Sequence, residues 1–378
     1  MNKKLGLYIH IPFCKQVCPY CDFHKMVASD NLQENYIKAL IKEANLKGIS
    51  KFDLSTLYIG GGTPSTLKMD LLEMLFSSLK EVINLEKLEE FTFECNPEDI
   101  SMDLLKILKK YHVSRLSIGI QTLNKSFQQH IKREFECEKL STLVKLINEF
   151  GFSNYSFDLM YGFLNQTTID IKEDIDKLIS LNPTHISIYS LIVEDHTIFG
   201  KLKKDGKILE SSDDEQAKEY LFIIDYLEKF GYHQYETSNF SKIGFESKHN
   251  LIYWNHDDYL CLGSGASSFY DDVRSVTTTS IHNYINNLNN DLLPFVDSEF
   301  LDFEDVTDEF VMMALRLNKG VDKVKFKTLF GIDIFEYYPN IKYLIDNNII
   351  EECGKYLFIK KEYRYVANSV IVKFISDF

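Results

Sequence analysis

The first half of the chain repeats one unit: a short run of β-branched and aromatic residues, a turn, and then a segment with helical hydrophobic spacing. Because strands that alternate with helices form parallel sheets, this repeat predicts an α/β fold. The runs are apolar enough to be buried on both faces of the sheet. The six predicted strands are Leu5–Ile11, Ser55–Gly60, Glu90–Cys95, Arg115–Ile120, Asn154–Met160 and His185–Leu191.

The segments between these strands have the periodicity of amphipathic helices. Leucines recur every three or four residues within 67–84, and Ser101 has the residue type of a helix N-cap. Six strands with five crossovers predict either an open doubly wound sheet or a partial (β/α)6 barrel, and both place functional groups at the carboxyl ends of the strands. The predicted helices cover residues 31–47, 67–84, 101–111, 137–150 and 168–180.

The repeat stops near residue 195, so we divide the chain into 1–195, 196–299 and 300–378. The middle part combines a predicted helix at 213–230 with a turn-rich aromatic segment that we expect to cap the sheet. The last part resembles a winged helix, but it has more acidic than basic residues and lacks a DNA-binding footprint. Its predicted helices are 304–317, 322–330, 334–347 and a final one, with strands at 349–352 and 356–359.

The net charge of −14 repels phosphate backbones and anionic lipid headgroups, so nucleic acid is not an expected partner. The N-terminal apolar stretch is too short for a signal peptide, and no apolar run is long enough to span a membrane. Seven cysteines, an odd number, indicate reduced thiols rather than a disulfide framework. We therefore expect a cytoplasmic protein.

Three of the cysteines, Cys14, Cys18 and Cys21, fall within eight residues as Cx3Cx2C after the first predicted strand. Three soft ligands in one compact loop indicate a metal site. Zinc would need a fourth ligand, which His10 or His24 could supply. A [4Fe–4S] cluster held by three thiolates would instead leave one iron open. If S-adenosylmethionine (SAM) chelates that iron, an electron from the cluster can cleave the sulfonium and release a 5′-deoxyadenosyl radical.

Further polar residues follow the next predicted strands. The glycine-rich turn GGGTPS at 60–65 lets the backbone approach a ligand closely, or is a plain tight turn. Glu94 could bind an ammonium or a ribose hydroxyl, or cap the following turn. Gln121 and Asp158 occupy comparable positions at strands four and five. Arg133 could donate two hydrogen bonds to a ligand carboxylate, or be a solvated helix residue.

A third motif, HNLIYW, starts at His249 and contains the only tryptophan of the chain. A neutral imidazole beside large aromatic rings can ligate heme iron while the rings cover the macrocycle. Taken alone, the motif would more often be a packed aromatic turn. His256 and His282 are alternative axial ligands.

Together, Cx3Cx2C, YIHIPFC, GGGTPS, ECNPE and HNxxYW resemble the radical SAM superfamily and, within it, the oxygen-independent coproporphyrinogen III dehydrogenase (HemN-like) family. The closest resemblance is to its HemW-type heme chaperone subgroup, and it covers nearly the whole chain. It implies a [4Fe–4S] cluster on Cys14, Cys18 and Cys21, and His249 as heme ligand. It implies contacts with a first SAM at Tyr8, Gly61, Gly62, Thr63 and Glu94. The positions that surround a second SAM in the dehydrogenase are matched here by Tyr20, Gln121, Arg133 and Asp158.

Two departures separate the chain from the dehydrogenase. The dehydrogenase has the pattern Cx3Cx2CxC, and an extended N-terminal region precedes that pattern. Phe23 stands at the last cysteine position, and only 13 residues precede Cys14, so we expect no N-terminal lid. The resemblance therefore implies a chaperone that passes heme to acceptor hemoproteins such as respiratory enzymes, with transient peripheral membrane contact and a homodimer. The alternatives are a coproporphyrinogen dehydrogenase and a non-catalytic, zinc-stabilised binding protein.

Overall fold

The computed structural model describes residues 4–375, and its centre is a run of six parallel strands. The strands lie side by side in chain order, which confirms the predicted α/β sheet. They are β1 (Gly6–Ile11), β2 (Thr56–Gly61), β3 (Glu90–Cys95), β4 (Arg115–Gln121), β5 (Tyr155–Tyr161) and β6 (His185–Ser190). Each begins within one residue of its predicted start.

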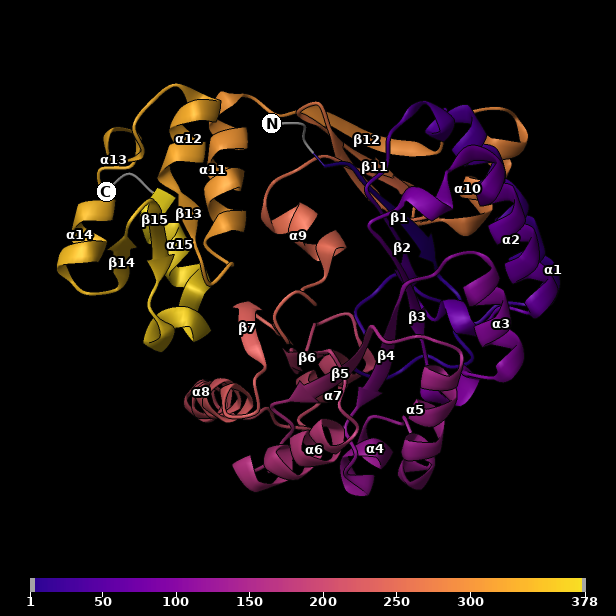
Figure 1. The fold of residues 1–378 in the computed structure, drawn as a ribbon, viewed down its shortest axis with the longest axis horizontal. Helices are drawn as coiled ribbons and strands as arrows, with labels where there is room; N and C mark the ends of the chain where they lie inside the picture. Colours follow the sequence, from indigo (N-terminus) through magenta and orange to yellow (C-terminus); the bar gives the residue numbers. More distant parts are fainter. Residues whose placement is uncertain (1–3, 376–378) are drawn as a thin grey trace.

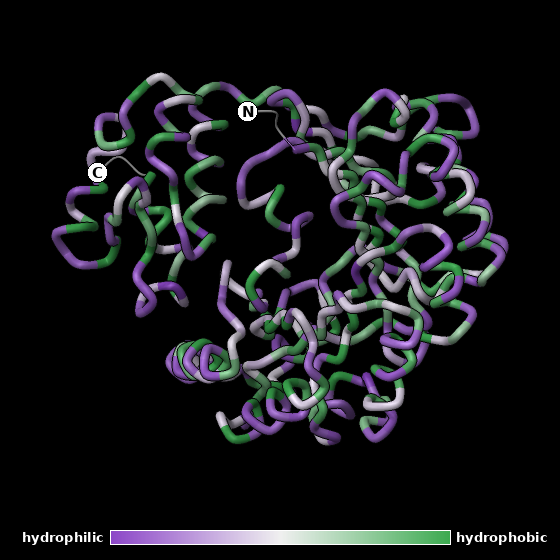
Figure 2. The backbone as a smooth tube through the Cα atoms, viewed as in Figure 1, coloured by the Kyte–Doolittle hydropathy of each residue, from purple (hydrophilic) through white to green (hydrophobic). Residues whose placement is uncertain are grey.

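Helices cover the outer side of the curved sheet (Figure 1). Hydrophobic and hydrophilic residues alternate along them, as expected for helices that turn one side to a sheet (Figure 2). The Ser101 hydroxyl accepts from the backbone N–H of Leu104, which confirms the predicted N-cap. The crossover helices are α1 (Asp30–Leu46), α2 (Met69–Val82), α3 (Met102–Lys110), α5 (Leu140–Glu149) and α6 (Thr168–Ser180), with a short α4 (Lys125–His130) before α5.

Both faces of the parallel strands are largely buried, as expected, but the residues on the two faces differ in polarity. On β3, Phe91 and Phe93 pack against Phe76 of α2, whereas Glu90 and Glu94 point to the inner face. The same alternation runs through all six strands, so a buried polar interior faces an apolar outer layer. The inner residues include Tyr8, His10, Thr56, Tyr58, Glu90, Thr92, Glu94, Arg115, Ser117, Ser156, Asp158, His185 and Ser187.

The middle part of the chain extends the sheet at both edges instead of only capping it. β9 (Tyr259–Leu262) pairs parallel with β1, and β8 (Asn239–Ser241) pairs antiparallel with β6. The resulting sheet has 12 strands and stays open. The added elements are β7 (His233–Glu236), β10 (Ser267–Tyr270), β11 (Val273–Thr277), β12 (Phe295–Phe300), α7 (Ile198–Lys204), α8 (Asp213–Glu228), α9 (Lys248–Trp254) and α10 (Ile281–Asn289).

The last part of the chain has a core of its own, built from residues between Phe310 and Phe374. The predicted helix 334–347 is interrupted, because Pro339 cannot donate a helical hydrogen bond. The elements are α11 (Phe303–Ala314), α12 (Lys323–Phe330), α13 (Ile334–Tyr337), α14 (Ile341–Asp346), α15 (Ala367–Ile375), and a sheet of β13 (Val321–Asp322), β14 (Ile350–Cys353) and β15 (Tyr356–Ile359).

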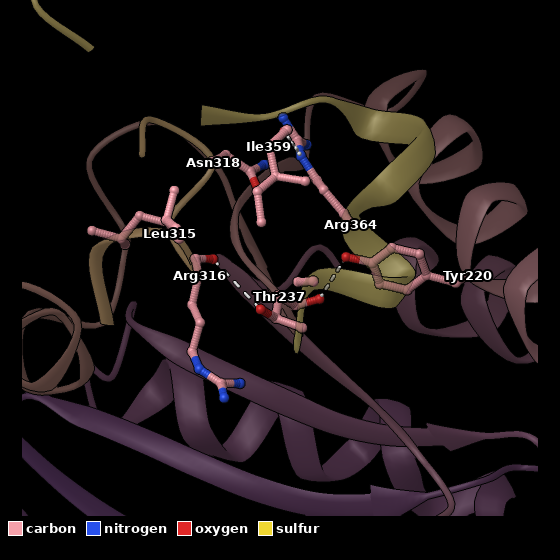
Figure 3. A pocket seen from close by; sticks show the side chains of 9 residues that line it. Tyr220, Thr237, Leu315, Arg316, Asn318, Ile359 and Arg364 are labelled. Carbon is pink, nitrogen blue, oxygen red and sulfur yellow. Dashed lines mark hydrogen bonds between the residues drawn. The ribbon is translucent and has the colours of Figure 1, made fainter. Parts of the chain in front are cut away.

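The C-terminal part packs against β7, α8 and α9 (Figure 1). A cavity of about 10 Å³ remains in this joint, room for one water molecule, between Tyr220, Thr237 and residues of the C-terminal part (Figure 3). Tyr220 donates to the Thr237 carbonyl at 3.2 Å, and the Thr237 hydroxyl donates to the Arg316 carbonyl at 3.5 Å. Among residues 4–375, no helix is long and apolar enough to cross a lipid bilayer.

Glu43 of α1 ties the β9–β10 turn to the helix layer. Its fully buried carboxylate accepts from the Gly263 N–H at 2.8 Å and the Tyr284 hydroxyl at 2.5 Å. The Lys47 ammonium lies 2.8 Å from its other oxygen. A buried carboxylate with three partners is costly to remove, because its partners are left without an acceptor.

We expect Glu43→Ala to lower the free energy of unfolding by about 3 kcal/mol, since it leaves the buried Lys47 charge unpaired. Urea unfolding followed by circular dichroism would measure the change. Glu34→Ala is the matched control, because Glu34 pairs with Lys38 on the exposed side of the same helix and should change stability by less than about 1 kcal/mol. Equal effects of the two variants would contradict this role of Glu43.

Candidate functional site

The three clustered cysteines lie on one loop at the carboxyl end of β1, where the β/α repeat predicted the functional groups. Backbone hydrogen bonds close the loop at its base, from Cys14 N–H to the Met26 carbonyl at 3.0 Å and from Met26 N–H to the Pro12 carbonyl at 2.7 Å. The Cys21 N–H bonds to the Cys18 carbonyl at 3.2 Å, which forms a tight turn between two of the cysteines. All three thiols are partly exposed.

A small hydrophobic cluster, separate from the main core, supports this cysteine loop. Tyr20 packs against it from the loop, so the side chain expected at a second SAM instead contributes to local packing in this structure. The Phe199 N–H also donates to the Pro19 carbonyl at 2.9 Å, and His196 contacts Asp22. The β6–α7 segment therefore holds the cysteine loop in place. The buried members are Ile131, Met160, Phe163, Leu191 and Phe199.

The donor set of the loop suits a cluster of soft metal ions. Burial raises the pKa of the Cys14 and Cys21 thiols, and neighbouring cysteine charges raise both further, so the thiols lie within electrostatic reach of one another. The Thr63 hydroxyl donates to the Cys14 sulfur at 3.5 Å. A bound cation would reverse these shifts, because it stabilises the thiolates. Three partly exposed thiols on a closed loop therefore fit a [4Fe–4S] cluster with three protein ligands.

The two candidate fourth ligands of zinc differ in how far the protein already engages them. Both ring nitrogens of His10 are engaged, Nδ1 with the Tyr8 hydroxyl at 3.1 Å and Nε2 with the His24 carbonyl at 2.8 Å. The His24 ring stacks on His10 and bonds to the Ser264 hydroxyl at 3.2 Å. Within the described residues 4–375, no three His, Cys, Asp or Glu side chains are grouped to hold a single metal ion.

The glycine-rich turn lies beside the cysteine loop, because the N–H groups of Gly62 and Thr63 bond to the carbonyls of Ile11 and Phe13 at 2.8 Å each. Gly61 has φ +115°, and a Cβ there would lie 2.5 Å from the His10 ring. Only glycine fits this position. The turn is thus a close backbone surface next to the thiols, as the sequence predicted.

Glu94 faces the glycine turn from β3. Its carboxylate accepts from the Tyr58 hydroxyl at 2.6 Å and from the Gly61 N–H at 3.1 Å. Burial, with help from Asp158, raises its pKa from 4.5 to about 7, despite these hydrogen bonds. Tyr8 lies beside Tyr58, with ring centroids 5.9 Å apart, and burial, followed by the Glu94 charge, raises its pKa. An ammonium group here would be a stabilising partner for Glu94.

The remaining predicted SAM residues lie at the same end of the sheet. Gln121 ends β4 at a bulge with φ +69°, and its side chain folds back over Gly119. Arg133 is buried, not solvated; it donates to the Asn96 side chain and to the Gly119 carbonyl at 3.2 Å. Asp158 accepts from two inner-face serine hydroxyls, and burial raises its pKa.

His249 does not lie with these residues. It sits in α9 inside the sheet, beside Thr56 and Glu90 at the amino ends of β2 and β3. Its Nδ1 bonds to the Thr56 hydroxyl at 2.7 Å and its Nε2 to the Tyr253 hydroxyl at 2.8 Å. The side chain is buried, which lowers its pKa to about 3. Both nitrogens are engaged by hydroxyl groups here, so ligation of heme iron by His249 would require the ring to give up one of these hydrogen bonds.

The alternative ligands His256 and His282 differ in exposure. His256 is mostly buried, with φ +54°, and contacts Glu309 at 3.3 Å, which also binds Arg274 through both carboxylate oxygens. This triad joins the sheet to α11. His282 lines an asparagine-rich groove of about 460 Å³ between α1 and α10.

Sequence reasoning missed the residues that fix α9. Glu90 accepts from the N–H groups of Lys248 and His249 at 3.0 Å each, and Lys325 donates to the Asn255 carbonyl at 3.0 Å. Arg316 lies 5.9 Å from the Trp254 ring, and its guanidinium points away from the other labelled side chains in Figure 3. The alternation of polar and apolar residues in strands such as Glu90–Cys95 could have indicated the polar inner face to which α9 binds.

The chain is similar to known proteins over its full length. Residues 8–178 match the radical SAM superfamily and 301–364 match the HemN C-terminal domain. The chain is 35% identical to the heme chaperone HemW of Lactococcus lactis, covering 100% of this chain and 99% of that protein, and 34% identical to the HemW of Bacillus subtilis, covering 98% and 99%. The solved coproporphyrinogen III oxidase (HemN) of Escherichia coli shares the fold, with TM-score 0.85, 22% identity and coverage of 99% and 90%.

We expect ionisation of Glu94 to destabilise the protein. The pKa of Glu94 is about 7 in the folded protein, whereas that of an unfolded glutamate is 4.5. Between these pH values the folded state binds more protons than the unfolded state, so the free energy of unfolding falls as pH rises. Relative to Glu94→Gln, the free energy of unfolding of the wild type should fall by about 3 kcal/mol between pH 4.5 and 8. Urea unfolding at several pH values measures this. Glu149→Gln, at an exposed position, is the control; parallel pH curves for wild type and Glu94→Gln would refute the expectation.

We expect His249→Ala to lower the free energy of unfolding by about 3 kcal/mol, because it empties a buried site and leaves the Thr56 and Tyr253 hydroxyls unpaired. Thermal and urea unfolding would report the loss. His233→Ala changes an exposed histidine and should leave stability unchanged. A His249→Ala protein as stable as the wild type would contradict the structural role of this side chain.

Proposed function

This chain belongs to the heme chaperone HemW family, and we propose that it binds heme and passes it to acceptor hemoproteins such as respiratory enzymes. The observation that carries the proposal is the 35% identity to a HemW over essentially the full length of both chains. A match that includes the C-terminal domain concerns the whole protein, not only the radical SAM part.

The proposal includes a resident [4Fe–4S] cluster on Cys14, Cys18 and Cys21. When bound, such a cluster with an open iron supplies a site for SAM and an electron. Tyr8, Thr63, Glu94 and the Gly61–Gly62 backbone would surround SAM, with Glu94 as the partner of its ammonium. A second SAM site at Tyr20, Gln121, Arg133 and Asp158 would require those side chains to give up contacts that they now make with the protein.

Phe23 favours heme binding over coproporphyrinogen decarboxylation. It occupies the last cysteine position of the dehydrogenase pattern and its side chain is 69% exposed next to the cysteine loop. A flat apolar ligand would cover it. Delivery to respiratory enzymes would bring the protein to a membrane surface for a short time, and a homodimer is proposed from the same family resemblance.

The test is anaerobic reconstitution with iron and sulfide, followed by SAM and either hemin or coproporphyrinogen III. We expect one hemin per chain by visible spectroscopy and no protoporphyrinogen. The cluster should be lost in Cys14→Ala/Cys18→Ala/Cys21→Ala, but retained in Cys353→Ala, which removes an exposed cysteine far along the chain. Catalytic loss of carbon dioxide with formation of 5′-deoxyadenosine would identify a dehydrogenase instead. A colourless protein that holds zinc would contradict both the iron–sulfur heme chaperone and the dehydrogenase.

A further inference from the structure

Two cations without an acidic partner lie at the end of α9 that faces the C-terminal part of the chain. The guanidinium carbon of Arg316 is 5.9 Å from the centre of the Trp254 ring, and the Lys319 ammonium donates to the Asn255 side-chain oxygen at 3.4 Å. The Arg316 guanidinium also donates to the side-chain oxygen of Asn368 at 3.0 Å. These partners are neutral. Within residues 4–375, neither Arg316 nor Lys319 forms a salt bridge with a carboxylate.

Both cations have lost part of their hydration. Burial lowers the pKa of Arg316 and that of Lys319, and the nearby Lys325 charge lowers the pKa of Lys319 further. A desolvated cation is stabilised by an anion that accepts its hydrogen bonds. Glu236 is the carboxylate that acts on Arg316, but burial raises the pKa of Glu236 to about 7. The protein therefore balances the charge of Arg316 only in part.

Backbone contacts fix Arg316 at the edge of the sheet. Leu317 forms an antiparallel bridge with Glu236 of β7, and the Thr237 hydroxyl donates to the Arg316 carbonyl at 3.5 Å. The guanidinium points away from the other side chains of this joint (Figure 3), toward α9 inside the sheet. Tyr189 of β6, which joins β7 through β8, is 42% exposed, so solvent reaches this side of the sheet. A ligand on the inner side can therefore reach the guanidinium.

The indole of Trp254 provides a third donor at this helix end. Its Nε1 is buried and has no hydrogen-bond partner within the described residues. Buried N–H groups without an acceptor are rare in folded proteins. A carboxylate can accept hydrogen bonds from an indole, a guanidinium and an ammonium, and those to the charged donors are the stronger ones. The donors around the end of α9 therefore suit a ligand that carries carboxylates.

We propose that Arg316, Lys319 and the Trp254 indole N–H bind the propionate carboxylates of heme. This inference rests on the proposed function and names the residues that hold the acidic edge of the cargo. A protein with a net charge of −14 repels a ligand with two carboxylates unless local cations intervene. His249, the iron ligand expected from the motif, stands five residues before Trp254, about 7.5 Å along the same helix. Iron and propionates would thus be held from the two ends of α9, without any covalent or electron-transfer step.

The test compares hemin with its dimethyl ester, which has the same ring and iron but no ionised carboxylate. Each is titrated into the reconstituted full chain in the same buffer, with visible spectra as the readout. The wild type should prefer hemin by about tenfold or more, as hydrogen bonds to charged groups predict. Arg316→Gln/Lys319→Gln should remove this preference and leave the affinity for the ester and the visible bands of the bound iron unchanged. Trp254→Phe keeps an aromatic ring and should weaken binding of hemin more than binding of the ester.

Arg364→Gln is the matched control. Arg364 lies in the same joint and also lacks a salt bridge within residues 4–375, but it donates to the Gln234 side-chain oxygen at 3.1 Å and to the Ile359 carbonyl at 3.4 Å. This variant should keep the wild-type preference for hemin.

Three results would overturn the proposed propionate site. They are equal affinity of the wild type for hemin and its ester, an Arg316→Gln/Lys319→Gln protein that keeps the preference, and one that loses affinity for both porphyrins alike. No binding of either porphyrin by the wild type would overturn the proposed function itself, which is a different result.

Discussion

The rest of the structure depends on the need to satisfy polar groups buried on the inner side of the sheet. Arg115 is almost fully buried there, and Glu90 provides its strongest favourable charge interaction. A buried charge must be paired, because the loss of hydration costs several kcal/mol. Glu90 in turn holds the start of α9. Glu90 thus connects Arg115 of the inner face with the start of α9.

The helix α9 also links the parts of the chain. Lys325 and Arg316 of the C-terminal part contact the far end of α9, while Thr56 and Glu90 hold its start. A short helix therefore mediates between the parallel strands and the C-terminal part. Within this motif His249 bonds to Thr56 and Tyr253, and Trp254 lies beside Arg316, so these motif residues also have structural roles.

The sequence predicted the regular part of this fold well, because the strands and crossover helices carry strong local periodicity. It predicted burial on both faces of the strands, which the structure shows, but it did not predict the polar inner face, where Glu90, Thr92 and Glu94 alternate with Phe91 and Phe93. The edge strands after residue 231 were not predicted, since short polar strands differ little from turns. The grouping of Cys14, Glu94 and the glycine turn followed from strand order. The occupied nitrogens of His249 did not, because hydrogen-bond partners 193 residues apart leave no local trace.

The small core under the cysteine loop has a consequence for how the protein matures. Its five buried residues, of which Phe199 and Leu191 are two, are not part of the large core of the sheet. Segments with few buried apolar contacts open locally at a lower free energy than the whole domain. We therefore expect this segment to open at a lower free energy than the parallel strands, and such opening would admit iron and sulfide to a chain that has already folded.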